Sequence, residues 1–375
     1  MIKILQIMDN ISKASGVSSF VMNIYRNIDK KEVQFDFLVS NKTRISYEEE
    51  IKAYGGRIYY INNPLSICTL LLACKNSNIF FENHSSDYTA IQLHSPTIAE
   101  MTIRYAKKYG VKNIIIHSHS SMFSSNFLKK LINYILVFRI KKLANHFWYC
   151  SKEAAEFLYG EQFQNLSDSQ WIKNAIDCNK FTYNQLAAYN FKEKLSMSKA
   201  KIALHVSNFS KIKNTSFLVD VIKEVITKDN EWRFIFAGDG PEKAKTEEAI
   251  KENGLSDYCF FTGFTDDVKS FMNAADLLLL PSIKEGLPVV TIEAQALGLT
   301  CFVTDTITRD ADIGGIEYLQ LNAQVWTKKI LAFKAKNSEG REVLSEKVKN
   351  SGFNIINEAK KVEKLFLKMV MEKLR

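Results

Sequence analysis

The segment from Asp276 to Gly298 combines three features whose order strongly limits what the chain can fold into. Leu277 to Leu280 is an unbroken run of leucine, which is typical of a parallel strand covered on both faces. Pro281 ends this strand, and Pro288 suits the first position of a helix that ends at Gly298. A strand that enters a helix through a tight loop leaves backbone N–H groups unpaired at the helix start. This arrangement favours a bound phosphate.

Two glutamates lie in this segment, Glu285 in the predicted loop and Glu293 on the predicted helix. A carboxylate is repelled by a neighbouring phosphate, so both side chains are better suited to accept hydrogen bonds from sugar hydroxyl groups. A site for a sugar nucleotide would combine these two tasks. The alternative is a pair of solvated glutamates near a helix end, and their spacing alone does not separate the two interpretations.

Strands alternate with helices along the chain, which predicts α/β domains with parallel sheets. The series begins with an apolar strand at residues 2–8, and Gly16 opens the helix that follows. A polar segment that runs to about residue 199 is expected to connect two domains, because the same rhythm restarts at Lys201. We therefore expect two tandem domains whose strand ends line a cleft.

Bulk composition indicates a soluble globular protein, with 46% hydrophobic and 24% charged residues in 375. The six cysteines form no CxxC pair and are expected to be reduced thiols of a cytoplasmic protein. Residues 1–8 are too short an apolar stretch for a signal peptide and are expected to form the first strand.

The net charge of +9 is concentrated in one region, because residues 101–152 contain ten Lys or Arg and no Asp or Glu. A helix predicted at residues 127–147 mixes these cations with apolar side chains. Such a helix is expected to lie on an anionic membrane surface, where each cation contributes about 1 kcal/mol. The alternative is a core helix with a solvated basic edge. No nucleic-acid-binding module accompanies the charge, so nucleic acid is not an expected partner.

Two histidines, His117 and His119, follow an apolar strand that begins at Asn113. Ligands of open α/β sheets bind outside the carboxyl ends of the strands, where a neutral imidazole can bond a sugar hydroxyl or a carbonyl. The alternative is a pair of loop histidines without a role. His94, at the end of another strand, is a weaker candidate. No third ligand lies near His117 and His119 in the sequence, so no metal site is expected.

Several motifs together resemble family 4 glycosyltransferases of the GT-B fold, close to the branch that builds bacterial exopolysaccharide and capsule repeats. The strongest match is Glu285 to Glu293, which fits the E-x7-E motif of that family. The supporting motifs are Ala237-Gly238-Asp239-Gly240-Pro241, Thr262-Gly263-Phe264, Ala274-Ala275-Asp276, Cys150-Ser151, His117-Ser118-His119 and Thr304-Asp305-Thr306-Ile307-Thr308. The resemblance covers nearly the whole chain.

The resemblance implies a GT-B architecture of two Rossmann-like domains with parallel sheets that face each other across an interdomain cleft. Residues 1–174 would form the acceptor-binding domain and residues 175–352 the domain that binds the nucleotide sugar. Residues 353–375 would form a C-terminal helix that returns to the N-terminal domain.

The resemblance also implies a retaining hexosyltransferase that uses a nucleotide diphosphate sugar, with a UDP-sugar as the first expectation. Glu293 would hold the ribose hydroxyls and Glu285 the donor sugar, with His119 favoured over His117 as the histidine that faces this sugar. The remaining donor-binding residues would be Gly16, Asn208, Lys213, Gly238, Phe264, Leu287, Val289 and Val290. Among these, Lys213 and backbone N–H groups would stabilise the leaving diphosphate.

No cofactor and no metal are expected in this scheme, since no Asp-x-Asp occurs where one would serve. The expected acceptor is a saccharide, lipid-linked, in exopolysaccharide or capsule biosynthesis. The protein would work in the cytoplasm as a peripheral protein on the inner face of the cell membrane, with residues 101–152 near the anionic surface.

The sequence departs from the family pattern at three positions. Asn208 stands where the family usually has Arg, one of two cations that clamp the diphosphate, while Lys213 retains the other. Losing a fixed cation beside a developing anion costs several kcal/mol of barrier. Ala175 and Ser15 each replace a glycine. One alternative is thus a catalytically weakened GT-B subunit that binds a partner enzyme. Another is a sugar nucleotide epimerase, against which the paired glutamates argue.

Overall fold

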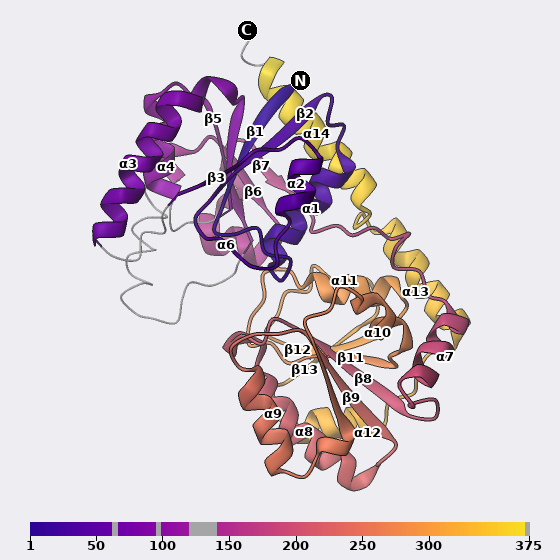
Figure 1. Ribbon diagram of the computed structural model, residues 1–375. Helices are drawn as coiled ribbons and strands as arrows, with labels where there is room; N and C mark the ends of the chain where they lie inside the picture. Colours follow the sequence, from indigo (N-terminus) through magenta and orange to yellow (C-terminus); the bar gives the residue numbers. More distant parts are fainter. Residues whose placement is uncertain (62–66, 95–98, 120–140, 372–375) are drawn as a thin grey trace. The chain divides into compact units, whose positions relative to one another are not determined.

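The computed structural model describes residues 1–61, 67–94, 99–119 and 141–371. The chain forms two compact units (Figure 1). Unit 1 contains Met1–Ala175 and Ile355–Arg375, and unit 2 contains Ile176–Asn354. The helix predicted at residues 127–147 lies largely outside the described residues.

Unit 1 is built around a seven-stranded parallel sheet of order β3-β2-β1-β4-β5-β6-β7. Its strands are β1 Ile2–Met8, β2 Val33–Val39, β3 Ile58–Tyr60, β4 Ala90–Leu93, β5 Asn113–Ser118, β6 His146–Tyr149 and β7 Ser169–Trp171. Its helices are α1 Gly16–Asn27, α2 Glu48–Ala53, α3 Ile67–His84, α4 Ala99–Lys108, α6 Lys152–Tyr159 and α14 Ile355–Met371.

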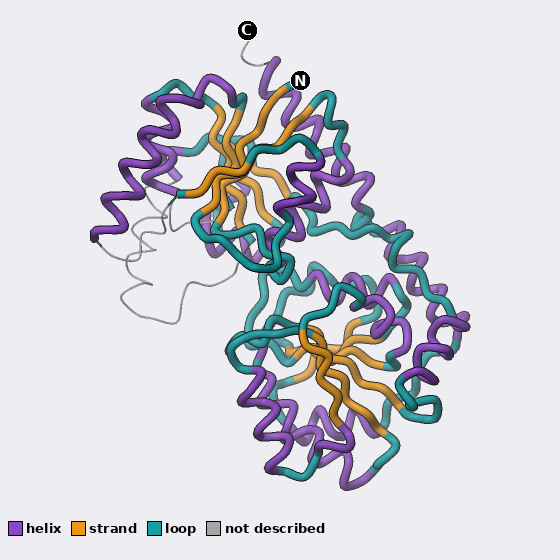
Figure 2. The backbone as a smooth tube through the Cα atoms, viewed as in Figure 1, coloured by secondary structure: helices purple, strands orange, loops and turns teal. Residues whose placement is uncertain are grey.

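Helices cover both faces of this sheet, as Figure 2 shows. The side chains of a strand alternate between faces, so β1 sends Ile4 and Met8 into one core and Leu5 and Ile7 into the other. The first core includes α1, α2 and α14, and the second includes α3, α4 and α6. Burial on both faces explains why these strands are nearly continuous apolar runs.

Unit 2 has a six-stranded parallel sheet of order β10-β9-β8-β11-β12-β13. Its strands are β8 Lys201–Val206, β9 Trp232–Ala237, β10 Cys259–Gly263, β11 Leu277–Leu280, β12 Thr300–Thr304 and β13 Ile316–Leu319. Its helices are α7 Gln185–Lys194, α8 Thr215–Lys228, α9 Lys243–Glu252, α10 Val268–Ala274, α11 Val289–Ala296, α12 Ala323–Leu331 and α13 Ser338–Asn350.

The core of unit 2 also has two halves, one on each side of its sheet. Helices α8, α9 and α12 contribute to one half, and α10 and α11 contribute to the other. The four leucines of β11 alternate between the two halves, as expected for a central strand buried on both faces. The predicted fold class of two Rossmann-like domains with parallel sheets is confirmed, and each unit is doubly wound.

Several sequence-based boundaries were wrong. The polar segment before Lys201 is no simple connection, because it contains α7, which packs against α10. Pro288 is the N-cap of α11 and not its first helical residue. Strand β13 and helices α12 and α13 were not predicted.

The described cysteines, Cys74, Cys150, Cys178, Cys259 and Cys301, are all free thiols. Among the described residues, no helix combines the length and the apolar character needed to cross a membrane.

Candidate functional site

The loop after β8 is held in place by close contact with the loop after β9. Gly238 has a φ of +128°, and a Cβ added there would collide with the carbonyl oxygen of Ser207. Gly240 meets the carbonyl oxygen of Asn208 in the same way. Only glycine allows both this backbone conformation and this approach. The sequence predicts Gly238 as a donor-binding residue. The structure shows that Gly238 lies against Ser207 and Gly240 against Asn208, so the two glycines position the loop after β8.

The buried side chain of His205 also holds the loop after β8 in place. The His205 imidazole donates from Nδ1 to the carbonyl of Leu279 at 2.9 Å and accepts at Nε2 from the Ser207 hydroxyl at 2.8 Å. Burial lowers the pKa of His205 to about 4, so the ring is neutral. Phe209, in the same loop, has a fully buried side chain, and its backbone φ is +43°. This strained conformation turns the backbone so that Asn208 is exposed.

Lys213 and Glu285 form an ion pair in unit 2, with 2.6 Å between Nζ and Oε1. Their side chains are only 17% and 13% exposed, so the pair is largely shielded from solvent. The two loops that carry them are joined by a hydrogen bond from the Ile283 N–H to the Ile212 carbonyl at 2.8 Å. The sequence predicted both residues as site residues but did not predict that they touch.

The start of α11 presents backbone N–H groups at the carboxyl end of β11. Pro288 is the N-cap and makes no side-chain capping bond. The Thr291 N–H bonds the Pro288 carbonyl at 3.0 Å, whereas Val289 and Val290 stand at the first two helical positions, whose N–H groups have no partner inside a helix. The positive end of the helix dipole lies here, so the position suits an anion.

Glu293 lies on the second turn of α11, partly buried. No described residue bonds its carboxylate, and burial raises the pKa of Glu293 to about 7. A desolvated carboxylate without a protein partner is suited to accept hydrogen bonds from ligand hydroxyl groups. The other predicted residues of unit 2 are Phe264, partly buried just after β10, and Leu287, which is buried.

In unit 1, Gly16 begins α1, and the Ser15 hydroxyl caps this helix by accepting from the Ser18 N–H at 3.4 Å. A Cβ added at Gly16 would meet nothing within 4 Å. The packing of the protein itself therefore does not require a glycine there, which leaves close approach of a ligand as a reason for one.

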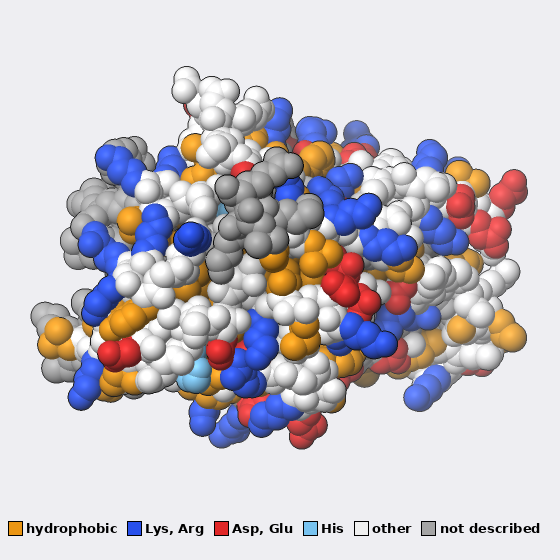
Figure 3. All heavy atoms as spheres, turned by 90° about the horizontal axis from the view of Figure 1, so that it is seen from above, with side chains coloured by type: hydrophobic (Ala, Val, Ile, Leu, Met, Phe, Trp, Pro, Cys, Tyr) orange, Lys and Arg blue, Asp and Glu red, His pale blue; other side chains and the backbone are white. Residues whose placement is uncertain are grey.

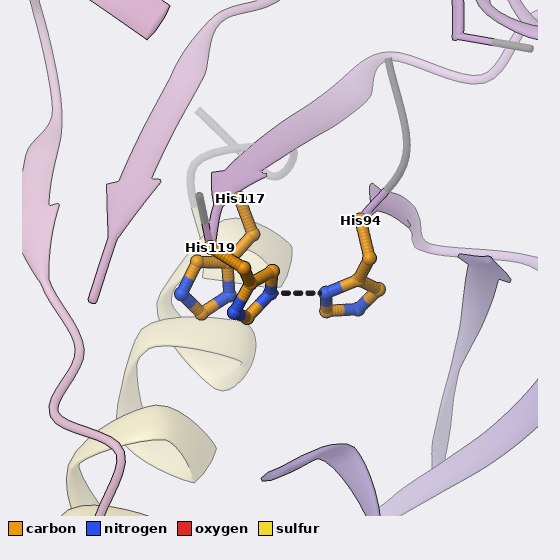
Figure 4. A group of neighbouring side chains, drawn as sticks. All are labelled: His94, His117 and His119. Atoms are coloured by element: carbon orange, nitrogen blue, oxygen red, sulfur yellow. Dashed lines mark hydrogen bonds between the residues drawn. The ribbon is translucent and has the colours of Figure 1, made fainter. Parts of the chain in front are cut away.

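The structure brings His117 and His119 together with His94, as Figure 4 shows. His94 Nδ1 and His119 Nε2 are 2.7 Å apart, and the rings of His117 and His119 face each other at 4.0 Å between centroids. Phe20 of α1 packs against both of these rings. His117 is buried beneath the surface, whereas His119 is partly exposed. The exposed position is the one that a ligand can reach.

Sequence reasoning missed two residues that position the site, His205 and Gln295, and it ranked His94 below His117 and His119. The Gln295 amide donates to the Ala311 carbonyl at 2.8 Å and accepts from the Ile313 N–H at 2.9 Å, which ties α11 to the loop after β12. His205 lies one residue before the carboxyl end of β8, and ligands of parallel sheets bind at such strand ends, so its position is a usable signal in the sequence. Gln295 carried no sequence signal, because its partners lie in an irregular loop.

These features define a class of protein. Residues 188–313 match the family described as glycosyl transferases group 1. Together with a relative that aligns along nearly the whole chain, this match shows that the chain belongs to this glycosyltransferase family. That relative is the putative glycosyltransferase EpsF of Bacillus subtilis (strain 168), which is 30% identical over 94% of this chain and 93% of its own length. The predicted family is confirmed.

Two further proteins place the chain more broadly. It is 24% identical to the UDP-Gal:alpha-D-GlcNAc-diphosphoundecaprenol alpha-1,3-galactosyltransferase of Escherichia coli, over 76% of this chain and 77% of that protein. The crystal structure of Anabaena HepE in complex with UDP and glucose has the same fold, with a TM-score of 0.79 and 15% identity over 97% of this chain and 99% of that one. The predicted GT-B fold is therefore confirmed.

Proposed function

We propose that this protein is a retaining glycosyltransferase that moves a hexose from a nucleotide diphosphate sugar to a saccharide acceptor. Membership of the family supports the transferase reaction. The observation that carries the assignment to a sugar nucleotide is the grouping of the Lys213–Glu285 ion pair, the start of α11 and Glu293 within unit 2.

Each of these groups matches one part of a nucleotide diphosphate sugar. The N–H groups of Val289 and Val290 and the ammonium of Lys213 suit the diphosphate. Glu293 suits the ribose diol, because a carboxylate accepts two hydrogen bonds. Glu285 suits hydroxyls of the donor sugar. In the free protein, Lys213 and Glu285 neutralise each other. A donor would supply each with a new partner, phosphate for the cation and hydroxyl groups for the anion.

The leaving diphosphate would be stabilised by these fixed dipoles and by Lys213, which is catalysis by preorganised charge. Our scheme includes neither a cofactor nor a metal. UDP is the proposed nucleotide, since HepE was crystallised with UDP and glucose. His119 is proposed to face the donor sugar, with His117 behind it.

A lipid-linked saccharide is the proposed acceptor, in exopolysaccharide or capsule biosynthesis at the inner face of the cell membrane. Two relatives support this proposal by their names, EpsF and the galactosyltransferase that acts on a diphosphoundecaprenol saccharide. The basic region at residues 101–152 supports contact with an anionic surface. Figure 3 shows Lys and Arg side chains spread widely over one face of the molecule, with fewer acidic side chains among them.

Asn208 favours a second candidate, a weakened subunit that binds a partner enzyme. Calorimetric titration with uridine and guanosine diphosphates, and then with their sugar conjugates, separates the candidates. We expect a UDP-sugar to bind and the sugar to appear on an acceptor with its anomeric configuration retained, as measured by NMR. Binding without transfer across an acceptor panel would favour the subunit. The enzyme assignment would be wrong if no nucleotide bound.

A further inference from the structure

The loop that carries Glu285, residues 281–287, joins β11 to the N-cap of α11 and is held at three consecutive carbonyl groups. Its first residue is Pro281, which has no N–H and therefore ends the pairing of β11 with β12 at Leu280. Beyond this point side chains, and not a neighbouring strand, bond the carbonyls of the loop. The position of Glu285 thus depends on those side chains.

Each of the three carbonyls accepts a hydrogen bond from a side chain that is distant in the sequence. The donors are the side chains of Asn214, Thr304 and Thr306, which bond the carbonyls of Pro281, Ser282 and Ile283 in that order. The two threonines belong to the motif at residues 304–308, which carries part of the family resemblance but has no part in the donor site proposed above.

The backbone of Ile283 is held by both of its polar groups. Its N–H donates to the Ile212 carbonyl, in the loop after β8, at 2.8 Å. Its carbonyl accepts from the Thr306 hydroxyl, in the turn after β12, at 2.7 Å. Lys213 directly follows Ile212, and Glu285 stands two residues after Ile283. These backbone contacts therefore support the ion pair between Lys213 Nζ and Glu285 Oε1, which are 2.6 Å apart.

The turn that carries Thr306 is fixed to the core of unit 2. The Asp305 N–H bonds the Leu319 carbonyl of β13 at 3.0 Å, and the side chain of Ile307 is buried. Thr306 itself is exposed, whereas Thr304 is fully buried. The Thr306 hydroxyl can thus be removed without leaving a cavity in the core, which makes this residue the one to test.

We propose that Thr306 is a positioning residue for the donor sugar, because it fixes the Ile283 carbonyl and thereby the place of the Glu285 carboxylate. The inference rests on the proposed function, in which Glu285 accepts hydrogen bonds from hydroxyls of that sugar. Such bonds span about 2.5–3.0 Å between oxygens, so a loop that shifts by about 1 Å loses them. Thr306 acts through Glu285 and does not touch the donor. UDP lacks the sugar, so Thr306 affects the binding of a UDP-sugar and not of UDP.

The first measurement needs no donor. Hydrogen exchange reports how often the bond from the Ile283 N–H to the Ile212 carbonyl opens. Thr306→Val removes the hydroxyl and keeps the shape of the side chain, so we expect the Ile283 amide to exchange at least about fivefold faster. Thr306→Ser retains a hydroxyl and should restore slow exchange. The matched control is Thr227→Val, which removes an exposed hydroxyl that donates to the Lys223 carbonyl, also at 2.7 Å, and should leave this exchange unchanged.

The second measurement is calorimetric titration of each variant with UDP and with a UDP-sugar. Thr306→Val should weaken UDP-sugar binding by about fivefold, the effect of one ordinary hydrogen bond, and leave the affinity for UDP within about twofold. In a Glu285→Gln background, Thr306→Val should weaken UDP-sugar binding little further, because the two residues act as a unit. Thr306→Ser and Thr227→Val should both bind the UDP-sugar as the unaltered protein does.

Three results would overturn the inference. Unchanged exchange of the Ile283 amide in Thr306→Val would show that the hydroxyl does not hold the loop. Equal weakening of UDP and UDP-sugar binding, or no weakening of either, would show that Thr306 has no specific role at the sugar. Additive effects of Thr306→Val and Glu285→Gln would show that Thr306 does not act through Glu285. An unaltered protein that binds no UDP-sugar would refute the proposed function, and the donor role of Thr306 with it, a result distinct from the other three.

Discussion

Glu293 has a carboxyl pKa of about 7 in the folded protein, above the value of about 4.3 in an unfolded chain. The folded state therefore binds the extra proton between these values, and the contribution of Glu293 to stability is lost as pH rises toward about 7. Glu293→Gln should raise the free energy of unfolding by about 2 kcal/mol at about pH 8, and by much less at about pH 5. Urea unfolding of the ligand-free protein at both pH values measures this difference.

The matched control is Glu252→Gln, which changes an exposed glutamate at the end of α9. This control should shift stability little at either pH. An equal effect of Glu293→Gln at both pH values would show that the Glu293 carboxyl group does not titrate in this range.

Asn208 is exposed and uses its side-chain oxygen only for a weak local bond from the Ser210 N–H at 3.4 Å. An arginine there would place a cation on a loop whose backbone is already fixed by Gly238 and Gly240. We expect Asn208→Arg to bind a UDP-sugar about tenfold more tightly, because charge-assisted bonds to phosphate are stronger than neutral ones. Calorimetry measures the affinity, with Asn208→Gln as the uncharged control. Unchanged or weaker binding would show that residue 208 does not contact the diphosphate.

At this scale the sequence predicted residue types better than their partners. Lys213 and Glu285 were both predicted, but their ion pair depends on the adjacency of β8 and β11, which are not neighbours in the chain. His94 was undervalued for the same reason. A search for metal ligands near His117 and His119 in the sequence could not find a third histidine that only the pairing of β4 with β5 brings close.

At the scale of elements, the loop after β9 requires glycine at position 238, because the backbone has a positive φ there and leaves no room for a Cβ atom. Gly238→Ala would combine a disfavoured φ with a collision against Ser207, so either unit 2 loses stability or the loop after β8 moves. We expect a loss of more than about 2 kcal/mol, or a marked loss of UDP-sugar affinity. Gly254→Ala is the control, because Gly254 also has positive φ but an added Cβ would meet nothing within 4 Å. It should cost only about 1 kcal/mol, measured by urea unfolding. If Gly238→Ala and Gly254→Ala lowered the free energy of unfolding equally, the contact between Gly238 and Ser207 would be excluded as the cause.

Helix α14 contributes a second prediction at the scale of elements. Phe366 is fully buried and packs its ring against Trp148 at 5.2 Å and Phe35 at 5.8 Å between centroids. Phe366→Ala should lower the free energy of unfolding by about 3–5 kcal/mol, through lost burial and a remaining cavity. Ile356→Ala on the same helix should cost less than about 1 kcal/mol, since Ile356 is 41% exposed. Similar losses for the two variants, followed by circular dichroism in urea, would contradict the packing of α14 on unit 1.

The helices and strands that could be predicted from the sequence are those with a regular pattern of apolar residues. Buried strands such as β11 were found because both of their faces are apolar, and α14 because its apolar stripe is regular. In α7, by contrast, Ala188 is the buried residue, and the helix docks through Phe191 on Phe271. A helix with a single buried residue has no periodic apolar signal. Strand β13 is short and only partly buried before Leu319, so its pattern is equally weak.

For the molecule as a whole, the net charge of +9 carries a prediction about membranes. The protein should sediment with vesicles that contain phosphatidylglycerol and not with vesicles of phosphatidylcholine alone. Binding should weaken between about 0.1 M and about 1 M salt, because the screening length falls from about 10 Å to about 3 Å. A Lys107→Gln, Lys108→Gln double variant removes two cations from the end of α4 and should bind less. Equal binding to neutral vesicles would show that charge does not drive the contact.

Unit 1 is discontinuous in the chain, because α14 follows all of unit 2 and then completes the core beside α1. During synthesis the ribosome therefore makes every strand of the first sheet, and then the whole second sheet, before it supplies the helix that covers Phe35 and Trp148. Unit 2 has its complete sequence first and can finish folding first. The growing chain must keep the uncovered apolar face of unit 1 from aggregating through this interval, which makes that nascent face a natural substrate for chaperones.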